Sequence, residues 1–333
     1  IFWIRTLRSN DMDNILTIRD LKVAFQVKGK LAYALDGINI DIPKGKIVGI
    51  VGESGCGKSM TAMSIMGLIK NPGKIVGGSI DFCGTELTKM SVRDYAKIRG
   101  KDISMIFQEP MTSLNPVVKV GKQVMEAIIL HEKISKEEAK MRVIEIFNEV
   151  GIPEAEKRFN SYPHELSGGL RQRVMIGMAM ICKPKLLIAD EPTTALDVTI
   201  EAQILKLMKK LCESVGTSII MITHNMGVVA EICDYVYVMY AGRVMESTLT
   251  KTLFNETAHP YTNGLLKSIP TIGKKQDRLY TIKGNVPNIL NLPKGCRFVD
   301  RCDYAQDICF SSRPADEYIK DNHMVSCFLH KRI

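Results

Sequence analysis

The chain has 333 residues, 45% of them hydrophobic, and a formal net charge of +9 at pH 7. This length and apolar content exclude a disordered or fibrous protein and suit one large domain with an appendage, or two domains. No apolar run reaches the length of a membrane-spanning helix, and the positive charge fits phosphate ligands, anionic headgroups or nucleic acid without choosing among them.

The first residues contain neither the long apolar core nor the cleavage site of a signal peptide. We predict that residues 1–11 are a disordered or non-native segment ahead of a start at Met12. Short strands are predicted over 15–18 and 21–25. A third strand, over 45–51, leads directly into a glycine-rich stretch, after which a helix is expected.

That glycine-rich stretch, residues 52–59, has the spacing of a phosphate-binding loop. Glycines let backbone N–H groups close around a phosphate without Cβ clashes. The predicted cradle consists of Gly52, Ser54, Gly55, Cys56 and Gly57. Lys58 should reach the β and γ oxygens, and Ser59 should offer its hydroxyl to Mg²⁺. The following helix, whose first turn contains Met60, points its positive N-terminus at the phosphates.

The middle of the chain alternates helices and apolar strands. Gln108 follows a strand and precedes a region of about 110–182 that is predicted to be helical, with apolar residues at helical spacing over 136–150. A strand then ends at Asp190 and Glu191. Asp190 suits the outer sphere of Mg²⁺, and Glu191 is placed to polarise an attacking water.

A helix over 200–215 and a strand over 218–223 follow, as expected for parallel β-α-β units. His224, just after this strand, is predicted to contact the γ-phosphate from the edge of the sheet. A hairpin over 235–246 closes the domain, and we place its boundary near residue 250.

Beyond this boundary, prolines interrupt the sequence and four cysteines gather near the end. Cys296, Cys302, Cys309 and Cys327 are separated by 5, 6 and 17 residues. The spacing lacks the close cysteine pair that is usual in structural zinc sites. Four thiolates can equally hold a [4Fe–4S] cluster. A cluster, Zn²⁺, and unliganded or disulfide-bonded thiols are therefore the three alternatives.

The order of these motifs resembles that of an ATP-binding-cassette (ABC) ATPase over about residues 14–248. The series comprises the Walker A loop, the Q-loop at Gln108, the signature loop at 166–170, the Walker B strand, the D-loop at 194–197 and the H-loop at His224. The resemblance implies an α/β fold, a P-loop NTPase cassette over 12–250. It has a RecA-like core, an antiparallel β subdomain and a helical subdomain over about 110–182. Residues 251–333 would form a small Cys-rich C-terminal extension.

The resemblance also implies a composite ATP site between two cassettes. Ser167, Gly168 and Gly169 of one cassette would touch the γ-phosphate held by the other, with Asp197 in the D-loop. Gln108 would join the Mg²⁺ site to the helical subdomain. An upstream aromatic residue would stack on adenine, for which we choose Phe25, with Tyr33 in reserve. The predicted catalytic residues are Glu191, His224, Gln108 and Lys58.

Further stretches resemble the dipeptide/oligopeptide importer branch, which also includes nickel importers. They are Leu170 at the end of the signature loop, residues 108–116, 162–165 and 259–262. This branch implies ATP-driven solute import, with the chain bound peripherally at the cytoplasmic face of the cell membrane. The solute itself cannot be read from the chain. Its cysteine-rich tail resembles the extension of peptide-importer ATPases, which favours the [4Fe–4S] cluster over zinc.

The implied partners are a second ABC ATPase subunit, identical or a sister chain, and two integral-membrane permease subunits. An extracytoplasmic solute-binding protein would act indirectly, and no nucleic acid is expected. A soluble ABC ATPase acting on nucleic acid is the alternative function. A metal-storage or redox module with a vestigial ATPase is a third, disfavoured by the full set of catalytic residues.

Overall fold

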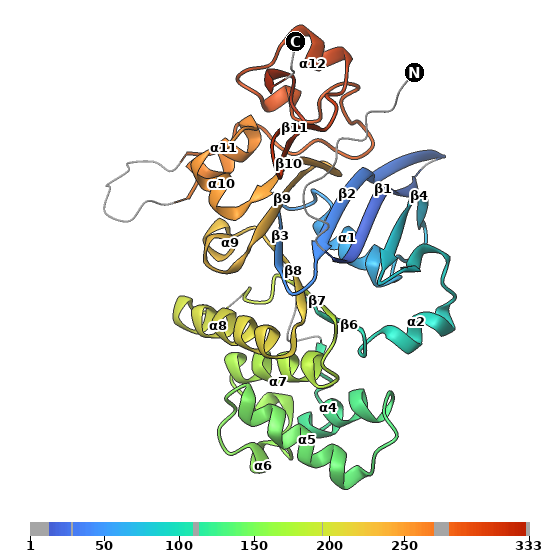
Figure 1. The fold of residues 1–333 in the computed structure, drawn as a ribbon, viewed down its shortest axis with the longest axis vertical. Coiled ribbons are helices and arrows are strands. Elements are labelled where there is room, and N and C mark those ends of the chain that lie inside the picture. The colour runs from blue at the N-terminus through green and yellow to red at the C-terminus, as the bar shows by residue number, and fades with distance from the viewer. Residues whose placement is uncertain (1–12, 28, 109–112, 195, 270–279, 331–333) are drawn as a thin grey trace.

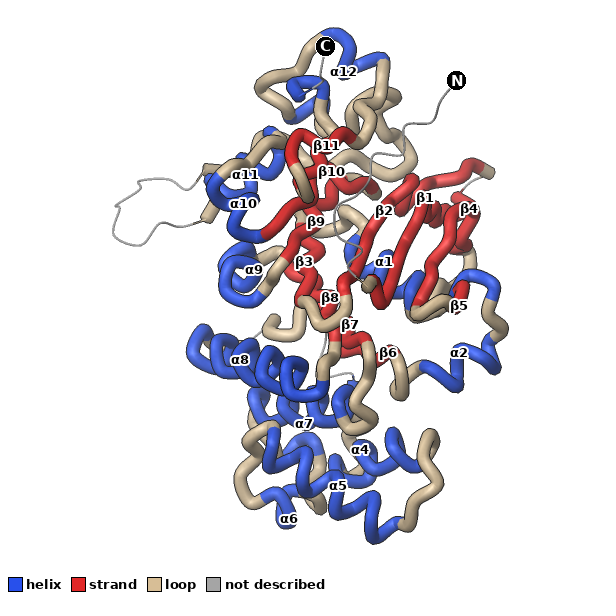
Figure 2. Tube along the Cα trace, viewed as in Figure 1, coloured by secondary structure: helices blue, strands red, loops and turns tan. Residues whose placement is uncertain are grey.

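The structure is a computed structural model that describes residues 13–27, 29–108, 113–194, 196–269 and 280–330. Figure 1 shows a central sheet with an antiparallel sheet beside it, a group of helices at one end and the C-terminal segment at the other. Figure 2 shows that much of the C-terminal segment is loop. In the described ranges, no helix is both long and apolar enough to cross a bilayer.

Eight strands form the central sheet, in the order β11-β12-β10-β9-β3-β8-β7-β6. Its parallel strands are β3 Ile47–Val51, β6 Ile103–Ile106, β7 Leu186–Asp190, β8 Ser218–Thr223 and β9 Tyr235–Tyr240. Every residue of β3, β7 and β8 is buried, as expected for parallel strands covered on both faces. The carboxyl ends of these three strands lie at one edge. Three parts of the site therefore lie next to one another where the strands end: the phosphate loop, the acidic pair Asp190 and Glu191, and His224.

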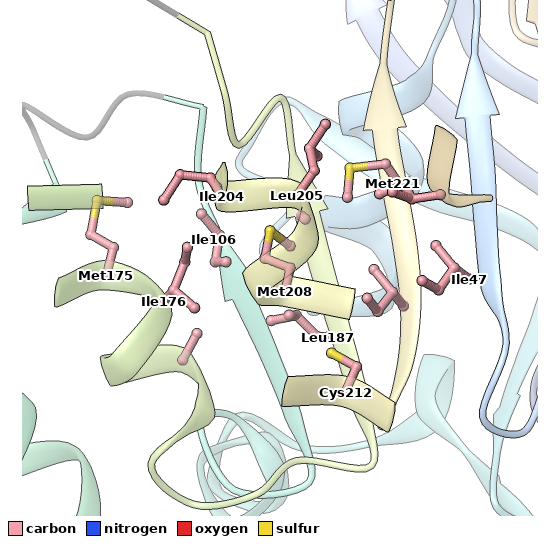
Figure 3. Close-up of a cluster of buried hydrophobic side chains, with 14 of the residues drawn as sticks. Ile47, Ile106, Met175, Ile176, Leu187, Ile204, Leu205, Met208, Cys212 and Met221 are labelled. Atoms are coloured by element: carbon pink, nitrogen blue, oxygen red, sulfur yellow. The ribbon is translucent and has the colours of Figure 1, made fainter. Parts of the chain in front are cut away.

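Alternate residues of these strands enter two hydrophobic cores. Val48 packs toward α1 Lys58–Ile65 and the antiparallel sheet, whereas Ile47 packs toward the helices on the other face. Those helices are α8 Val198–Val215 and α9 Met226–Ile232. Figure 3 shows part of the second core, where sheet residues meet residues of α8 and of its neighbour α7 Gly168–Met180. The labelled members are Ile47, Ile106, Met175, Ile176, Leu187, Ile204, Leu205, Met208, Cys212 and Met221.

The antiparallel sheet has the order β2-β1-β4-β5. Its strands are β1 Asn14–Val27, β2 Lys30–Pro43, β4 Gly73–Phe82 and β5 Thr85–Glu86. The two short strands predicted over 15–18 and 21–25 are one long strand. The register of this strand shifts near Asp20, whose φ is 44°. Gly78 on β4 leaves room for the Asp20 backbone, because a Cβ on Gly78 would lie 2.4 Å from the Asp20 carbonyl oxygen. The segment η1 Leu87–Lys89 and helix α2 Val92–Ile98 lead back to β6.

The helical group lies between β6 and β7 in the chain. It comprises α4 Val120–Ile129, α5 Lys136–Glu149, α6 Ala155–Arg158, η2 Pro163–Glu165 and α7 Gly168–Met180. Ser135 caps α5 by accepting the Glu138 N–H, and Gly151 follows the helix at a positive φ of 73°. Figure 1 shows α7 between the other helices of this group and the central sheet.

The C-terminal segment returns to the central sheet. After β10 Arg243–Leu249, the chain forms α10 Thr250–Asn255 and α11 Pro260–Lys267. It then forms η3 Val299–Arg301, α12 Asp307–Ser311, β11 Glu317–Lys320, β12 His323–Val325 and η4 Phe328–His330. Strand β12 pairs antiparallel with β10, so the segment adds two strands to the central sheet. This long-range pairing has no counterpart in the hydrophobic periodicity of the chain.

Candidate functional site

The phosphate loop connects β3 to α1, and its glycines are required by its backbone. Gly52, Gly55 and Gly57 have φ values of 149°, 76° and 110°. A Cβ on Gly52 would lie 2.2 Å from the Met239 carbonyl oxygen, and one on Gly57 would lie 2.7 Å from the Leu35 side chain. These close approaches explain why only glycine suits both positions.

Lys58 is buried and folds over the loop. Its Nζ donates to the carbonyl oxygens of Gly52 at 2.7 Å and Glu53 at 3.1 Å. Cys56 is fully buried, with its Sγ 3.9 Å from Nζ, so its side chain belongs to the floor of the loop. The ammonium therefore lies among the backbone groups that were predicted to form the cradle.

Ser59 and Asp190 lie together beside the loop. A hydrogen bond joins their side chains, and Asp190 is 3% exposed. Burial raises the pKa of Asp190, the hydrogen bond from Ser59 opposes this, and the nearby Glu191 carboxylate adds to the rise. The Oδ1 atom of Asp190 is buried and has no hydrogen-bond partner among the described residues. A hydroxyl beside a carboxylate with an unsatisfied oxygen is a donor set that fits Mg²⁺.

Glu191 is the meeting point of four predicted motifs. Its Oε1 lies 3.0 Å from Nδ1 of His224, and its Oε2 accepts from Nε2 of Gln108 and Oγ1 of Thr194, both at 3.1 Å. Burial alone would raise the pKa of Glu191, but the hydrogen bond and charge of His224 and the hydrogen bond of Thr194 hold it below the usual value. The residue adopts a positive φ of 47°, and its N–H donates to Ile222 at 2.9 Å. An ionised carboxylate is thus fixed beside Asp190.

The signature residues form the N-terminus of α7. Ser167 caps the helix by accepting the Leu170 N–H at 3.4 Å, and Ser167 and Gly168 are exposed. In the part of the chain that the structure describes, no atom lies within 4 Å of a Cβ placed on Gly168. Asp197 caps α8 in the same way, by accepting the Ile200 N–H at 3.0 Å. This open helix terminus is suited to an anion presented from outside the chain.

The remaining predicted ATP contacts lie on the antiparallel sheet and α1. Phe25 of β1 is partly buried over Gly73, where a Cβ would lie 2.7 Å from its ring. Tyr33, the reserve choice, lies on the neighbouring strand β2 and is also partly exposed. Met60 lies in α1 and packs partly against the core. Nothing in these contacts chooses between the two aromatic residues.

The four C-terminal cysteines line one pocket, together with Phe298 and His259. They are free thiols, as are the other five cysteines. Across the described residues, however, no three His, Cys, Asp or Glu side chains are arranged to hold a metal ion. The structure therefore gathers the predicted ligands around a common space without bringing them to coordinating positions.

Two contacts to the phosphate loop were missed by sequence reasoning. Tyr261 and Arg301, both from the C-terminal segment, hydrogen-bond to Glu53. Residues 259–262 resemble the importer branch of the family, but this resemblance predicts no contact with the phosphate loop. No sequence pattern around Arg301, which directly precedes Cys302, predicts its contact with Glu53.

Comparison with known proteins gives two family matches. Residues 35–194 match the family described as "ABC transporter". Residues 245–309 match the family described as "Oligopeptide/dipeptide transporter, C-terminal region".

Individual relatives match over nearly the whole chain. The chain is 52% identical to the Oligopeptide transport ATP-binding protein AppD of Bacillus subtilis, over 96% of this chain and 98% of that protein. It is 48% identical to the Oligopeptide transport ATP-binding protein OppD of Escherichia coli, over 97% of this chain and 95% of that protein. Among solved structures, the dimeric bacterial ABC transporter cassette MJ0796 matches with a TM-score of 0.64 and 28% identity, over 71% of this chain and 98% of that one.

Proposed function

Because the chain belongs to the ATP-binding subunits of oligopeptide/dipeptide ABC transporters, we propose that it hydrolyses ATP to drive the import of di- or oligopeptides through separate permease subunits. The observation that carries the hydrolytic part is the arrangement around Glu191. One ionised carboxylate is held by Gln108, Thr194 and His224 and lies next to the buried Asp190.

The residues divide the chemistry among themselves. Lys58 and the loop N–H groups bind and orient the β- and γ-phosphates, and Ser59 and Asp190 would hold Mg²⁺. When bound, that ion would neutralise negative charge on the phosphate oxygens. Glu191 orients a water for in-line attack on the γ-phosphorus and accepts its proton, while His224 and Gln108 fix the position of the carboxylate. The P–O bond to the β-phosphate breaks, leaving ADP and inorganic phosphate.

A second ABC ATPase subunit, the same chain or a sister chain, completes the site. Ser167, Gly168 and Gly169 would contact the γ-phosphate bound to the opposite subunit, and the exposure of that helix terminus supports this role. The similar MJ0796 cassette is itself dimeric, which supports the same arrangement here. We place the pair at the cytoplasmic face of the membrane, on two permease subunits fed by an extracytoplasmic solute-binding protein.

We further propose that Cys296, Cys302, Cys309 and Cys327 hold a [4Fe–4S] cluster. Their shared pocket supports this. A single zinc, at about 2.3 Å from each thiolate, would require the sulfurs to lie closer together than a four-iron cage does. Such a cluster would crosslink a segment with little regular structure.

Reconstitution tests the transport proposal. With permease subunits and the solute-binding protein in liposomes, short peptides should stimulate ATP hydrolysis and accumulate inside. Stimulation by Ni²⁺ but not by peptides would contradict the proposed solute. Stimulation of the isolated chain by nucleic acid would favour the alternative function, which the full-length relatives do not support.

A further inference from the structure

Glu53, the second residue of the phosphate loop, is held from two directions by the C-terminal segment. Arg301 donates from Nη1 to Oε2 at 2.6 Å and from Nη2 to Oε1 at 3.0 Å, a bidentate ion pair. The backbone N–H of Glu53 donates to the hydroxyl of Tyr261 at 2.9 Å. The side chain and the backbone of one loop residue are thus bound by residues 248 and 208 positions away.

Arg301 is itself fixed, so this contact is built into the fold. Its side chain is 4% exposed, and its Nε and Nη2 donate to the carbonyl oxygens of Lys283 at 2.7 Å and Ile282 at 3.3 Å. Nη1 also reaches the hydroxyl of Tyr240 at 3.4 Å. A guanidinium with its donors used in this way presents a rigid fork to the carboxylate.

Tyr261 is equally constrained. Its ring packs against those of Tyr240 and Phe298, with centroids 4.7 and 5.3 Å apart. Phe298 precedes the short helical turn η3 that ends at Arg301. The three rings and the guanidinium therefore form one unit, and this unit meets the loop at Glu53.

The phosphate loop needs such support for two reasons. Because the loop is rich in glycine, fixing its conformation costs conformational entropy. Ordering the loop before the ligand binds therefore raises its affinity for the ligand. A free carboxylate in the loop would also repel a triphosphate, whereas the pair with Arg301 neutralises it. The carbonyl of Glu53 in turn accepts from Lys58, so the position of residue 53 helps to set that of the ammonium.

We propose that Arg301 and Tyr261 are positioning residues for the phosphate loop, through which the C-terminal segment sets the affinity for ATP. Neither touches the reacting atoms. This rests on ATP binding at the loop, as proposed above, but does not require a metal at the cysteines.

The test is a set of variants of the full chain, assayed for the Kd of ATP and for thermal unfolding. Arg301→Gln leaves Glu53 uncompensated, and ATP affinity should fall about tenfold or more. Adding Glu53→Gln removes the stranded charge and should restore most of the loss. The matched control is Arg313→Gln, another C-terminal arginine, which pairs with Asp36 of β2 at 2.9 Å and should leave the Kd unchanged.

Tyr261→Phe keeps the packed ring and removes only the hydroxyl, so it reports on the loop even if Arg301→Gln fails to fold. ATP affinity should fall several-fold in a variant that unfolds near the wild-type temperature. Wild-type affinity in Tyr261→Phe and in any folded Arg301→Gln overturns the proposal. So does an equal loss in Arg313→Gln, or a double variant with no recovery. Failure of the wild-type chain to bind ATP would instead overturn the proposed function.

Discussion

The carboxylate of Glu191 accepts a hydrogen bond from the amide of Gln108 at 3.1 Å, across 83 positions in the sequence. Gln108 follows β6, from which the chain enters the helical group, whereas Glu191 follows β7. Under the proposed function, a movement of the helical group relative to the central sheet would therefore shift the carboxylate of Glu191.

Glu191→Gln should retain ATP binding and lose hydrolysis by about a hundredfold or more, because an amide keeps the shape but cannot accept the proton. Phosphate release and the Kd of ATP measure the two effects. Glu213→Gln, on the exposed side of α8, is the control and should hydrolyse ATP normally. Near-normal turnover in Glu191→Gln would show that another residue orients the water.

Ser167→Arg should block ATP-dependent dimerisation while leaving ATP binding intact, because the substitution puts bulk and charge at the exposed end of α7. Size-exclusion chromatography with ATP, in the Glu191→Gln background, measures the dimer. Ser135 caps α5 in the same manner. Ser135→Arg therefore controls for loss of a helix cap. If Ser167→Arg abolished ATP binding by a folded monomer, the signature loop would belong to the site of its own subunit.

The proposed cluster predicts about four irons and four labile sulfides per chain after anaerobic purification. Changing Cys296 or Cys302 to Ser should make the iron labile. The control is Cys83→Ser, because Cys83 is exposed and lies on the antiparallel sheet side of the molecule. One zinc per chain, without iron, would contradict the cluster.

Asp36 should stabilise the fold in a pH-dependent manner. Burial tends to raise its pKa, but Arg243, Arg297 and Arg313 outweigh this and hold the pKa below its usual value. The stabilisation is therefore present above the unfolded pKa of about 3.9 and is lost as the pH falls through the lower folded value. Asp36→Asn should lower the free energy of unfolding by about 2–4 kcal/mol at neutral pH, since it leaves the buried Arg297 without its carboxylate partner.

The measurement is the free energy of unfolding of wild type and of Asp36→Asn from pH 7 down to about pH 3. The difference in unfolding free energy between the two proteins should become smaller at acid pH. Asp41→Asn is the control, because Asp41 forms a more exposed ion pair with Arg19, and it should lower the free energy of unfolding less than Asp36→Asn does. A constant difference across this range would mean that the charge of Asp36 is not what stabilises the fold.

The sequence predicted those parts of the site that follow from local pattern. The glycine spacing at 52–57 predicts a tight loop. Four apolar residues precede Asp190 in β7, which predicts a buried strand with this carboxylate at its carboxyl end. The pairing of β12 with β10 and the binding of Glu53 by Arg301 have no local signal. Both depend on contacts between distant segments, and no periodicity in either segment encodes its partner.

The contact between Glu53 and Tyr261 also has a consequence in time. The loop emerges from the ribosome 208 residues before the tyrosine that supports it. At about 5–20 residues per second, this interval lasts about 10–40 s. The nascent cassette therefore passes through a period in which its cradle is present but unsupported. If Tyr261 has the positioning role proposed above, firm nucleotide binding is expected only once the chain is nearly finished.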